Sequence, residues 1–127
     1  MNGLLIASGL LAGFATLGHV TIGSKLFLRP FLSAELEAVP RKVMQTLFHF
    51  ITIDFALGTA VLLYAGISRD PVWDTFLAVL VTAIKFGLYA LVQIVAVSFS
   101  GIEGGLKKMF QWTFFLAISA TGLVGVL

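Results

Sequence analysis

Gln45 to Gly58 reads QTLFHFITIDFALG, an apolar segment that carries one histidine, His49, and one carboxylate, Asp54. An ionisable side chain at the centre of a bilayer costs roughly 2.5 to 3.5 kcal/mol on insertion scales. Each of these two residues is therefore a candidate site residue, and the rest of the chain is expected to supply its partners.

The composition places this segment in a membrane protein. The chain has 127 residues, of which 59% are hydrophobic and 11% are charged, whereas soluble domains carry about a quarter charged residues. A hydrocarbon core about 30 Å thick needs helices of about 20 residues. We therefore predict a single all-α domain over residues 1–127, a polytopic membrane protein with four transmembrane helices in an antiparallel bundle. The absence of cysteine excludes disulfides and thiolate chemistry.

The expected helices cover residues 3–27, 41–66, 71–100 and 106–127. Lys25 and Arg29 are expected to end the first one, and Pro30 and Pro40 bracket the next segment. A short interfacial helix over 31–39 is favoured there, with a loop as the alternative. In the turn at 68–71, the side chain at position 70 is expected to cap the third helix, and the proline at 71 suits its first position.

The first apolar run separates small from large side chains. At 100° per residue, Leu10, Phe14 and Leu17 lie opposite a face of small and weakly polar residues. That face holds Ser8, Gly9, Ala12, Ala15, Thr16, His19 and Gly23. Small residues let helix backbones approach closely in membranes, so this face is predicted to pack and the opposite one to meet lipid.

Basic residues set the expected orientation. Two loops on one side are flanked by Lys25, Arg29, Arg41, Lys42, Lys107 and Lys108. The positive-inside rule then places both termini on the non-cytoplasmic side of the cell's inner (plasma) membrane. The formal charge of +2 raises the possibility of nucleic acid, but basic residues at helix ends suit anionic lipid headgroups better. No nucleic-acid partner is expected.

Asp54 has an expected partner on the third helix. Asp54 and Lys85 both fall near the centres of consecutive antiparallel helices, at about 1.5 Å per residue, so an ion pair near the bilayer midplane is predicted. Tyr89 and Gln93 continue the polar stripe that carries Lys85. One alternative is a structural pair that fixes helix register, and the other is a role in proton, ion or ligand handling.

His49 is expected to face the first helix. His19 and His49 fall at the same depth, and two neutral imidazoles can ligate one haem b iron or one metal ion. Tyr89 and Gln111 reach about that depth from the other two helices. The alternative is that each histidine forms a hydrogen bond to a neighbouring side chain or carbonyl.

Part of the chain resembles a group of small four-helix proteins of bacterial membranes. The shared features are His19 followed by Gly23 and Lys25, a Leu-Arg-Pro turn at residues 28–30, and a histidine early in the second helix. They cover about the first 55 residues. Because that group has no assigned activity, the resemblance implies a membrane location and no particular chemistry.

Together these features favour a membrane binding or transport-type module for a small ligand, an ion or a proton. The site would comprise Asp54, Lys85, Tyr89, Gln93 and Gln111, with the two histidines nearby. A chain this small is expected to act as a homo-oligomer or as an accessory subunit of a larger complex. The alternatives are an electron-transfer protein that binds haem through His19 and His49, and a purely structural subunit. An enzyme is not favoured, because Asp54 has no second carboxylate within reach and no nucleophile elbow is present.

Overall fold

The computed structural model describes residues 1–68 and 73–127. Its helices, in chain order, are α1 (Gly3–Gly18), the π-helix η1 (His19–Leu28), α2 (Arg29–Ser33), α3 (Ala38–Ile67), α4 (Trp73–Ser98), α5 (Gly105–Lys108) and α6 (Gln111–Val126). Three continuous helical stretches, Gly3–Ser33, Ala38–Ile67 and Thr75–Ser98, are long and apolar enough to span a membrane. The cap and proline expected at positions 70 and 71 lie outside the described residues.

The first helical stretch is longer than the sequence indicated. It does not end near Lys25 and Arg29 but continues through η1 and α2 to Ser33. Pro30 lies near the start of α2, and it lacks the N–H that a regular helix would use. A π-helical stretch is one of the local adjustments that re-satisfy backbone groups freed in this way.

The interfacial helix expected over 31–39 is not formed as a separate element. Residues 31–33 complete α2, and α3 already begins at Ala38, so that Pro40 lies in its first turn, where the missing N–H costs nothing. Arg41 closes the short connection, because its Nη2 donates to the carbonyl oxygens of Ala34 and Leu36 at 3.1 and 2.7 Å.

The last predicted helix, 106–127, is interrupted. The helical backbone is broken at Met109 (φ −114°, ψ 65°), and α6 begins at Gln111. The indole of Trp112 donates to the carbonyl of Leu106 at 3.0 Å and so bridges this break. The 16 residues of α6 extend about 24 Å at 1.5 Å per residue, which is shorter than each of the three long stretches.

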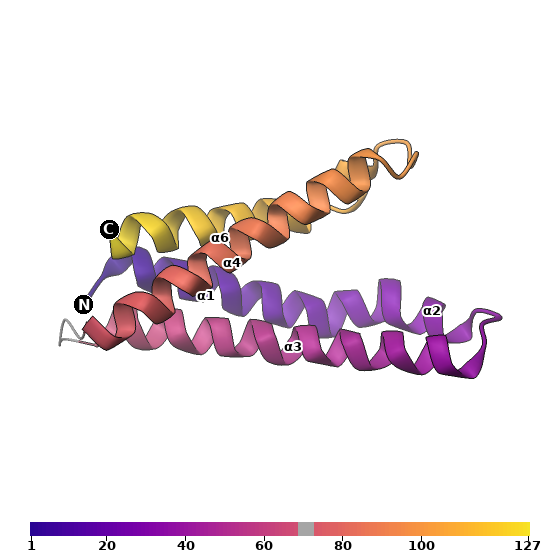
Figure 1. Cartoon of the computed structure of the whole chain (residues 1–127), viewed down its shortest axis with the longest axis horizontal. Coiled ribbons are helices and arrows are strands. Elements are labelled where there is room, and N and C mark those ends of the chain that lie inside the picture. Colours follow the sequence, from indigo (N-terminus) through magenta and orange to yellow (C-terminus); the bar gives the residue numbers. More distant parts are fainter. Residues whose placement is uncertain (69–72) are drawn as a thin grey trace.

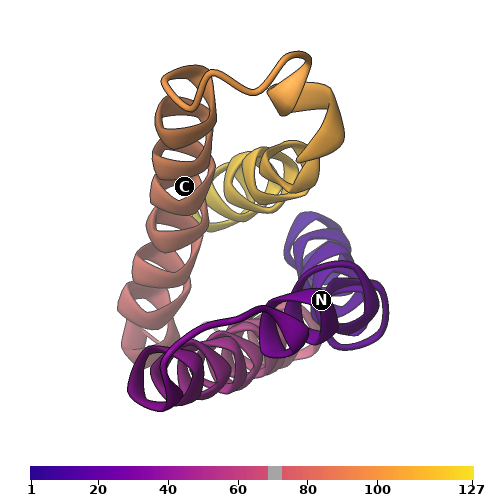
Figure 2. The ribbon, with the colours of Figure 1, turned by 90° about the vertical axis from the view of Figure 1, so that its right-hand side faces the viewer.

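The helices form two pairs that separate toward one end. The stretch α1–η1–α2 lies beside α3 along its whole length, while α4 packs on α6 and rises away from α3 (Figure 1). Figure 2 looks from the end where the pairs separate and shows α4 running up the left side from the level of α3, with α6 in the centre above α1 and α3. Packing of α6 on α1 joins the pairs. The arrangement is therefore more open than the antiparallel bundle that we predicted.

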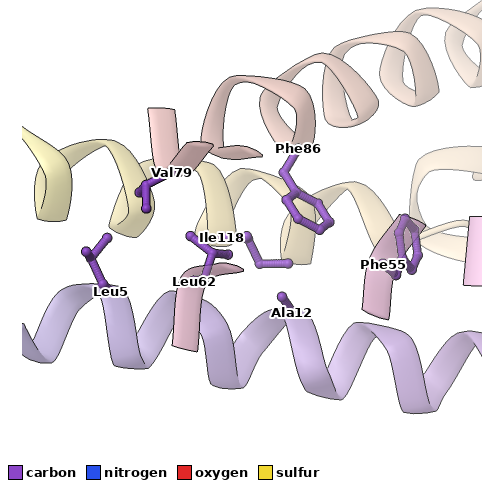
Figure 3. Packing of buried hydrophobic residues seen from close by; sticks show 7 residues of the cluster. All are labelled: Leu5, Ala12, Phe55, Leu62, Val79, Phe86 and Ile118. Carbon is purple, nitrogen blue, oxygen red and sulfur yellow. The ribbon is translucent and has the colours of Figure 1, made fainter. Parts of the chain in front are cut away.

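The core fills the region where α1, α3, α4 and α6 meet. Leu5 and Ala12 point from α1 toward the other helices, Ile118 comes from α6, and α3 and α4 add further apolar side chains (Figure 3). The buried cluster is Leu5, Ala12, Phe55, Leu62, Val79, Phe86 and Ile118. On α1 the predicted small face is buried at Ser8, Gly9 and Ala12, whereas Leu10, Phe14 and Leu17 are exposed, which confirms the separation of small and large side chains.

The closed end of the molecule is held by Asn2. Its side-chain oxygen accepts the N–H groups of Leu4 and Leu5 and so caps α1. Its Nδ2 donates to Gly125 of α6 at 2.6 Å, and its backbone N–H donates to Gly66 of α3 at 2.7 Å. One residue thus joins the ends of three helices.

α1 and α3 approach each other closely near this end. A Cβ on Gly66 would lie 2.7 Å from the backbone nitrogen of Ile6, and a Cβ on Gly9 would lie 2.9 Å from that of Leu63. Backbone atoms cannot yield as a flexible side chain does. Close approach through small residues is what holds helices together in lipid, so these glycines define the α1–α3 contact.

We expect Gly66→Ala to lower the free energy of unfolding by about 1 to 3 kcal/mol, the usual cost of overpacking. The free energy can be measured by titrating micelles of a mild detergent with SDS and following helicity. Gly18→Ala is the matched control, because no atom lies within 4 Å of its Cβ position and alanine favours a helix over glycine. Equal losses in both variants would contradict the close approach.

Candidate functional site: the Asp54 charge cluster

Asp54 is held by two side chains of α4. Lys85 Nζ lies 2.7 Å from Asp54 Oδ1 and donates a hydrogen bond to it. The hydroxyl of Tyr89 donates to Asp54 Oδ2 at 2.9 Å. The structure therefore brings three of the predicted site residues together, and both carboxylate oxygens have a donor.

Helical periodicity explains why both partners reach one carboxylate. Lys85 and Tyr89 are four residues apart in α4, so they lie on one face, one turn above the other. Gly58, one turn beyond Asp54 in α3, lies against Phe86 and Thr82. This close contact brings α4 within reach of Asp54.

The cluster is not sealed from its surroundings. The side chain of Lys85 is 26% exposed and that of Asp54 is 35% exposed. In a helix long and apolar enough to span a membrane, this exposed part must meet water, a ligand or another protein, because hydrocarbon offers no hydrogen-bonding partner.

Aromatic rings form the inner wall of the cluster. Phe55, Phe86, Tyr89 and Phe115 have mutual ring-centroid distances of 5.4 to 6.1 Å. Lys85 Nζ lies 5.4 Å from the Phe86 centroid and 5.9 Å from the Tyr89 centroid. A cation at this distance is attracted by the ring quadrupole, so the ammonium group has stabilising neighbours besides Asp54.

Gln93 and Gln111 meet one turn further along α4. Gln93 Nε2 donates to Gln111 Oε1 at 3.0 Å and lies 3.4 Å from the carbonyl of Met109. Gln93 Oε1 is shielded from solvent and has no hydrogen-bond partner among the described residues. A shielded acceptor without a donor is costly, and this oxygen is the natural contact for a water or for a ligand N–H or O–H group.

His19 is half-buried between α1 and α3. Its ring stacks on Phe48 with centroids 4.0 Å apart and meets Phe55 edge to face at 5.4 Å. Nε2 lies 3.1 Å from the carbonyl oxygen of Phe48. Because a carbonyl oxygen only accepts, Nε2 is the protonated nitrogen, and it would have to give up this bond to ligate a haem iron.

His49 has different surroundings. It is exposed, and its ring meets Phe48 edge to face at a centroid distance of 5.8 Å. Phe48 thus contacts both imidazoles, one on each side, while the histidines differ in burial and bonding. Residues 1–68 and 73–127 contain no group of three or more histidine, aspartate or glutamate side chains close enough to hold a metal ion.

Some residues around the site have no distinctive signature in the sequence. Phe55, Phe86 and Phe115 belong to the aromatic wall and Phe48 contacts both histidines. They are four of 12 phenylalanines in the chain, so residue type alone does not single them out. The adjacency of Lys85 and Phe86 in the sequence is a local hint that an aromatic ring lies near the ammonium group. The carbonyl of Phe48 as the partner of His19 has no sequence signature.

The site thus combines the Asp54–Lys85 ion pair with the Gln93 side chain, whose amide oxygen lacks a hydrogen-bond donor among the described residues. Comparisons with models of protein families, with curated proteins and with solved structures find no match. The chemistry of the site must therefore be argued from its geometry.

The Asp54–Lys85 contact predicts a strong energetic coupling. In a double-mutant cycle built from Asp54→Asn and Lys85→Gln, we expect the two losses of unfolding free energy to be non-additive by about 0.5 to 3 kcal/mol, the range for residues in contact. SDS titration of the four proteins in micelles measures this term.

A cycle between Lys85→Gln and Thr16→Ala is the control. Thr16 donates to its own helix at Ala12 and lies 3.3 Å from Thr59, so it shares no hydrogen bond with Lys85 and should behave additively. Additive losses in the Asp54–Lys85 cycle would show that the contact contributes no coupling.

Proposed function

We propose that the protein is a membrane-embedded module that binds or conducts a small ion or a proton at the Asp54–Lys85–Tyr89 cluster. The observation that carries this proposal is a bonded charge pair that is still one quarter to one third exposed within helices of membrane-spanning length. Ionisable residues inside membrane helices are characteristic of ion and proton pathways.

The cluster has the elements that such a site needs. Asp54 provides a carboxylate that can accept a cation or a proton, and Lys85 provides a charge that can compensate it. Tyr89 adds a hydroxyl directly bonded to the carboxylate. Gln93 and Gln111 extend the polar groups toward α5, the end of the molecule that carries most of the basic residues, so this end is the proposed cytoplasmic entrance.

The assembly and topology form part of this proposal. Both termini lie on the non-cytoplasmic side of the inner (plasma) membrane, and α6 forms a shorter fourth span. One chain of this size has little room for a closed pathway, so the module works as a homo-oligomer or as an accessory subunit of a larger membrane complex. Protein from a neighbouring subunit would then cover the exposed part of the cluster.

A second candidate is a structural subunit that needs no ligand. It is favoured by one observation: both oxygens of Asp54 already have donors. A fully bonded pair can serve to fix which helices meet and at what depth. The two candidates differ in whether Asp54 is needed only for assembly or also for transport.

Transport can be tested in sealed vesicles. With purified protein reconstituted and an ion or pH gradient imposed, we expect flux of H⁺, Na⁺ or K⁺ above that of empty vesicles. Asp54→Asn should reduce this flux by about tenfold or more, as expected if about 1.4 kcal/mol or more of stabilisation of the moving charge is lost.

Glu103→Gln, which changes an exposed carboxylate outside the spanning helices, is the control and should retain the flux. If well-folded Asp54→Asn conducts as well as the unchanged protein, Asp54 has no part in the pathway. If no flux occurs and Asp54→Ala blocks assembly, the structural candidate is correct.

The orientation can be tested by single cysteines, because the chain contains none. Leu127→Cys and Ile102→Cys replace residues that are 90% and 49% exposed. In spheroplasts, a membrane-impermeant maleimide should label position 127 directly and position 102 only after permeabilisation. The reverse pattern would place the termini in the cytoplasm.

A further inference from the structure

The first three turns of α3 carry an apolar groove that is lined by α3 alone in the described part of the chain. It has a volume of about 650 Å³ and is lined by Val39, Val43, Leu47 and Phe50, together with Ala38, Lys42 and Thr46. We call this surface the α3 groove. It lies at the end where α4 has moved away from α3 (Figure 1).

The α3 groove continues the helix face that packs on α4. Leu47 precedes Asp54 by seven residues and Phe50 precedes it by four, so all three share one face. From Asp54 onward this face meets Lys85 and Phe86. Before Asp54 it is bare, and the exposed fractions of Val43, Leu47 and Phe50 are 50%, 44% and 59%.

The groove offers an apolar wall and one cation. The hydroxyl of Thr46 is used within the helix, where it donates to the carbonyl of Lys42 at 2.9 Å, so only its methyl group is left for a ligand. The ammonium group of Lys42 donates to Gln45 Oε1 at 3.0 Å, at an exposed position. An ammonium group has three donors, and two remain for a bound anion.

The length of the groove matches one leaflet of a bilayer. Twelve residue steps from Ala38 to Phe50 correspond to about 18 Å of helix, and half of the hydrocarbon core is about 15 Å. Lys42 lies in the second turn, near the surface end, and Phe50 lies one turn before Asp54. A ligand that fits this groove would carry a charge near Lys42 and an apolar part that extends from there toward Phe50. Its apolar part would be about as long as an acyl chain.

Charge also favours a lipid over a second copy of this chain. In a membrane dimer with a two-fold axis along the bilayer normal, equivalent residues lie at equal depth, so Lys42 would face Lys42 across the groove. At this end of the molecule six basic side chains outnumber three acidic ones. The basic residues are Lys25, Arg29, Arg41, Lys42, Lys107 and Lys108, and the acidic ones are Glu35, Glu37 and Glu103.

We propose that the α3 groove seats an acyl chain of an anionic phospholipid whose phosphate is held by Lys42. This site rests on the insertion of the protein in a bilayer and not on the role of the Asp54 cluster. It places a lipid against the first turns of α3, on the exposed face that leads to Asp54.

Photocrosslinking in vesicles tests the proposal. The full chain is reconstituted in phosphatidylcholine with a small fraction of phosphatidylglycerol that carries a diazirine on its acyl chain, and crosslinked peptides are mapped by mass spectrometry. We expect crosslinks within residues 38–50. Unlabelled phosphatidylglycerol should compete about fivefold better than phosphatidylcholine, the preference expected from one basic residue near an anionic headgroup.

Variants separate the possible outcomes. Lys42→Gln should abolish the preference for the anionic lipid and Lys42→Arg should keep it. Lys25→Gln, which removes an exposed charge at the same end outside the groove, should keep it too. Leu47→Trp, which fills the groove, should lower the crosslinking yield while the protein remains folded.

Three results would overturn the proposal. Equal competition by both lipids would show ordinary contact with bulk lipid. A preference that persists in Lys42→Gln would place the headgroup elsewhere. Efficient disulfide formation between two copies of Val43→Cys would show that a second chain occupies the groove.

Discussion

Hydrocarbon offers no hydrogen bonds, so each polar group in an apolar helix must find its partner within the protein or reach an aqueous surface. Asp54 needs such partners most, because it carries a charge. Both of its hydrogen-bond donors, Lys85 and Tyr89, come from α4. α4 otherwise packs chiefly on α6. The carboxylate therefore fixes where α3 and α4 are linked, in addition to the packing of α6 on α1. The groups that α4 carries beyond this link, Gln93 first, turn toward α6.

The same constraint sorts the remaining polar side chains into two kinds. Most threonine hydroxyls bond carbonyls of their own helix, as Thr52 and Thr82 do, and therefore do not join helices. A smaller set joins helices far apart in sequence. The hydroxyl of Ser8 donates to Ile118 at 2.8 Å, and Asn2 bonds both Gly66 and Gly125. These few contacts fix the closed end. Toward the other end, the contacts of His19 with Phe48 and of Gln93 with Gln111 each join helices within one pair.

The helical period and the position of each residue along its helix were sufficient to predict which residues share a face. They did not predict over what length two helices remain in contact. They placed Asp54 and Lys85 within reach, and the atoms are 2.7 Å apart; they also identified the buried face of α1. The divergence of α4, the break at Met109 and the π-helix after Gly18 follow from crossing angles and backbone adjustments that a periodic pattern does not encode. His19 illustrates the limit, because its partner is a backbone carbonyl, that of Phe48, and a sequence pattern does not identify such a partner.

The contact between α1 and α6 has a consequence for how the chain matures. Ser8 and Ile118 are 110 residues apart, so the first helix completes its packing only when the last one has been made. During synthesis α1 and α3 can associate early, through the close approach at Gly9 and Gly66. The small face of α1 is fully packed only after α6 has been synthesised. Contacts of such long sequence separation form slowly. The half-made protein is thus a helical hairpin whose small face on α1 is still uncovered.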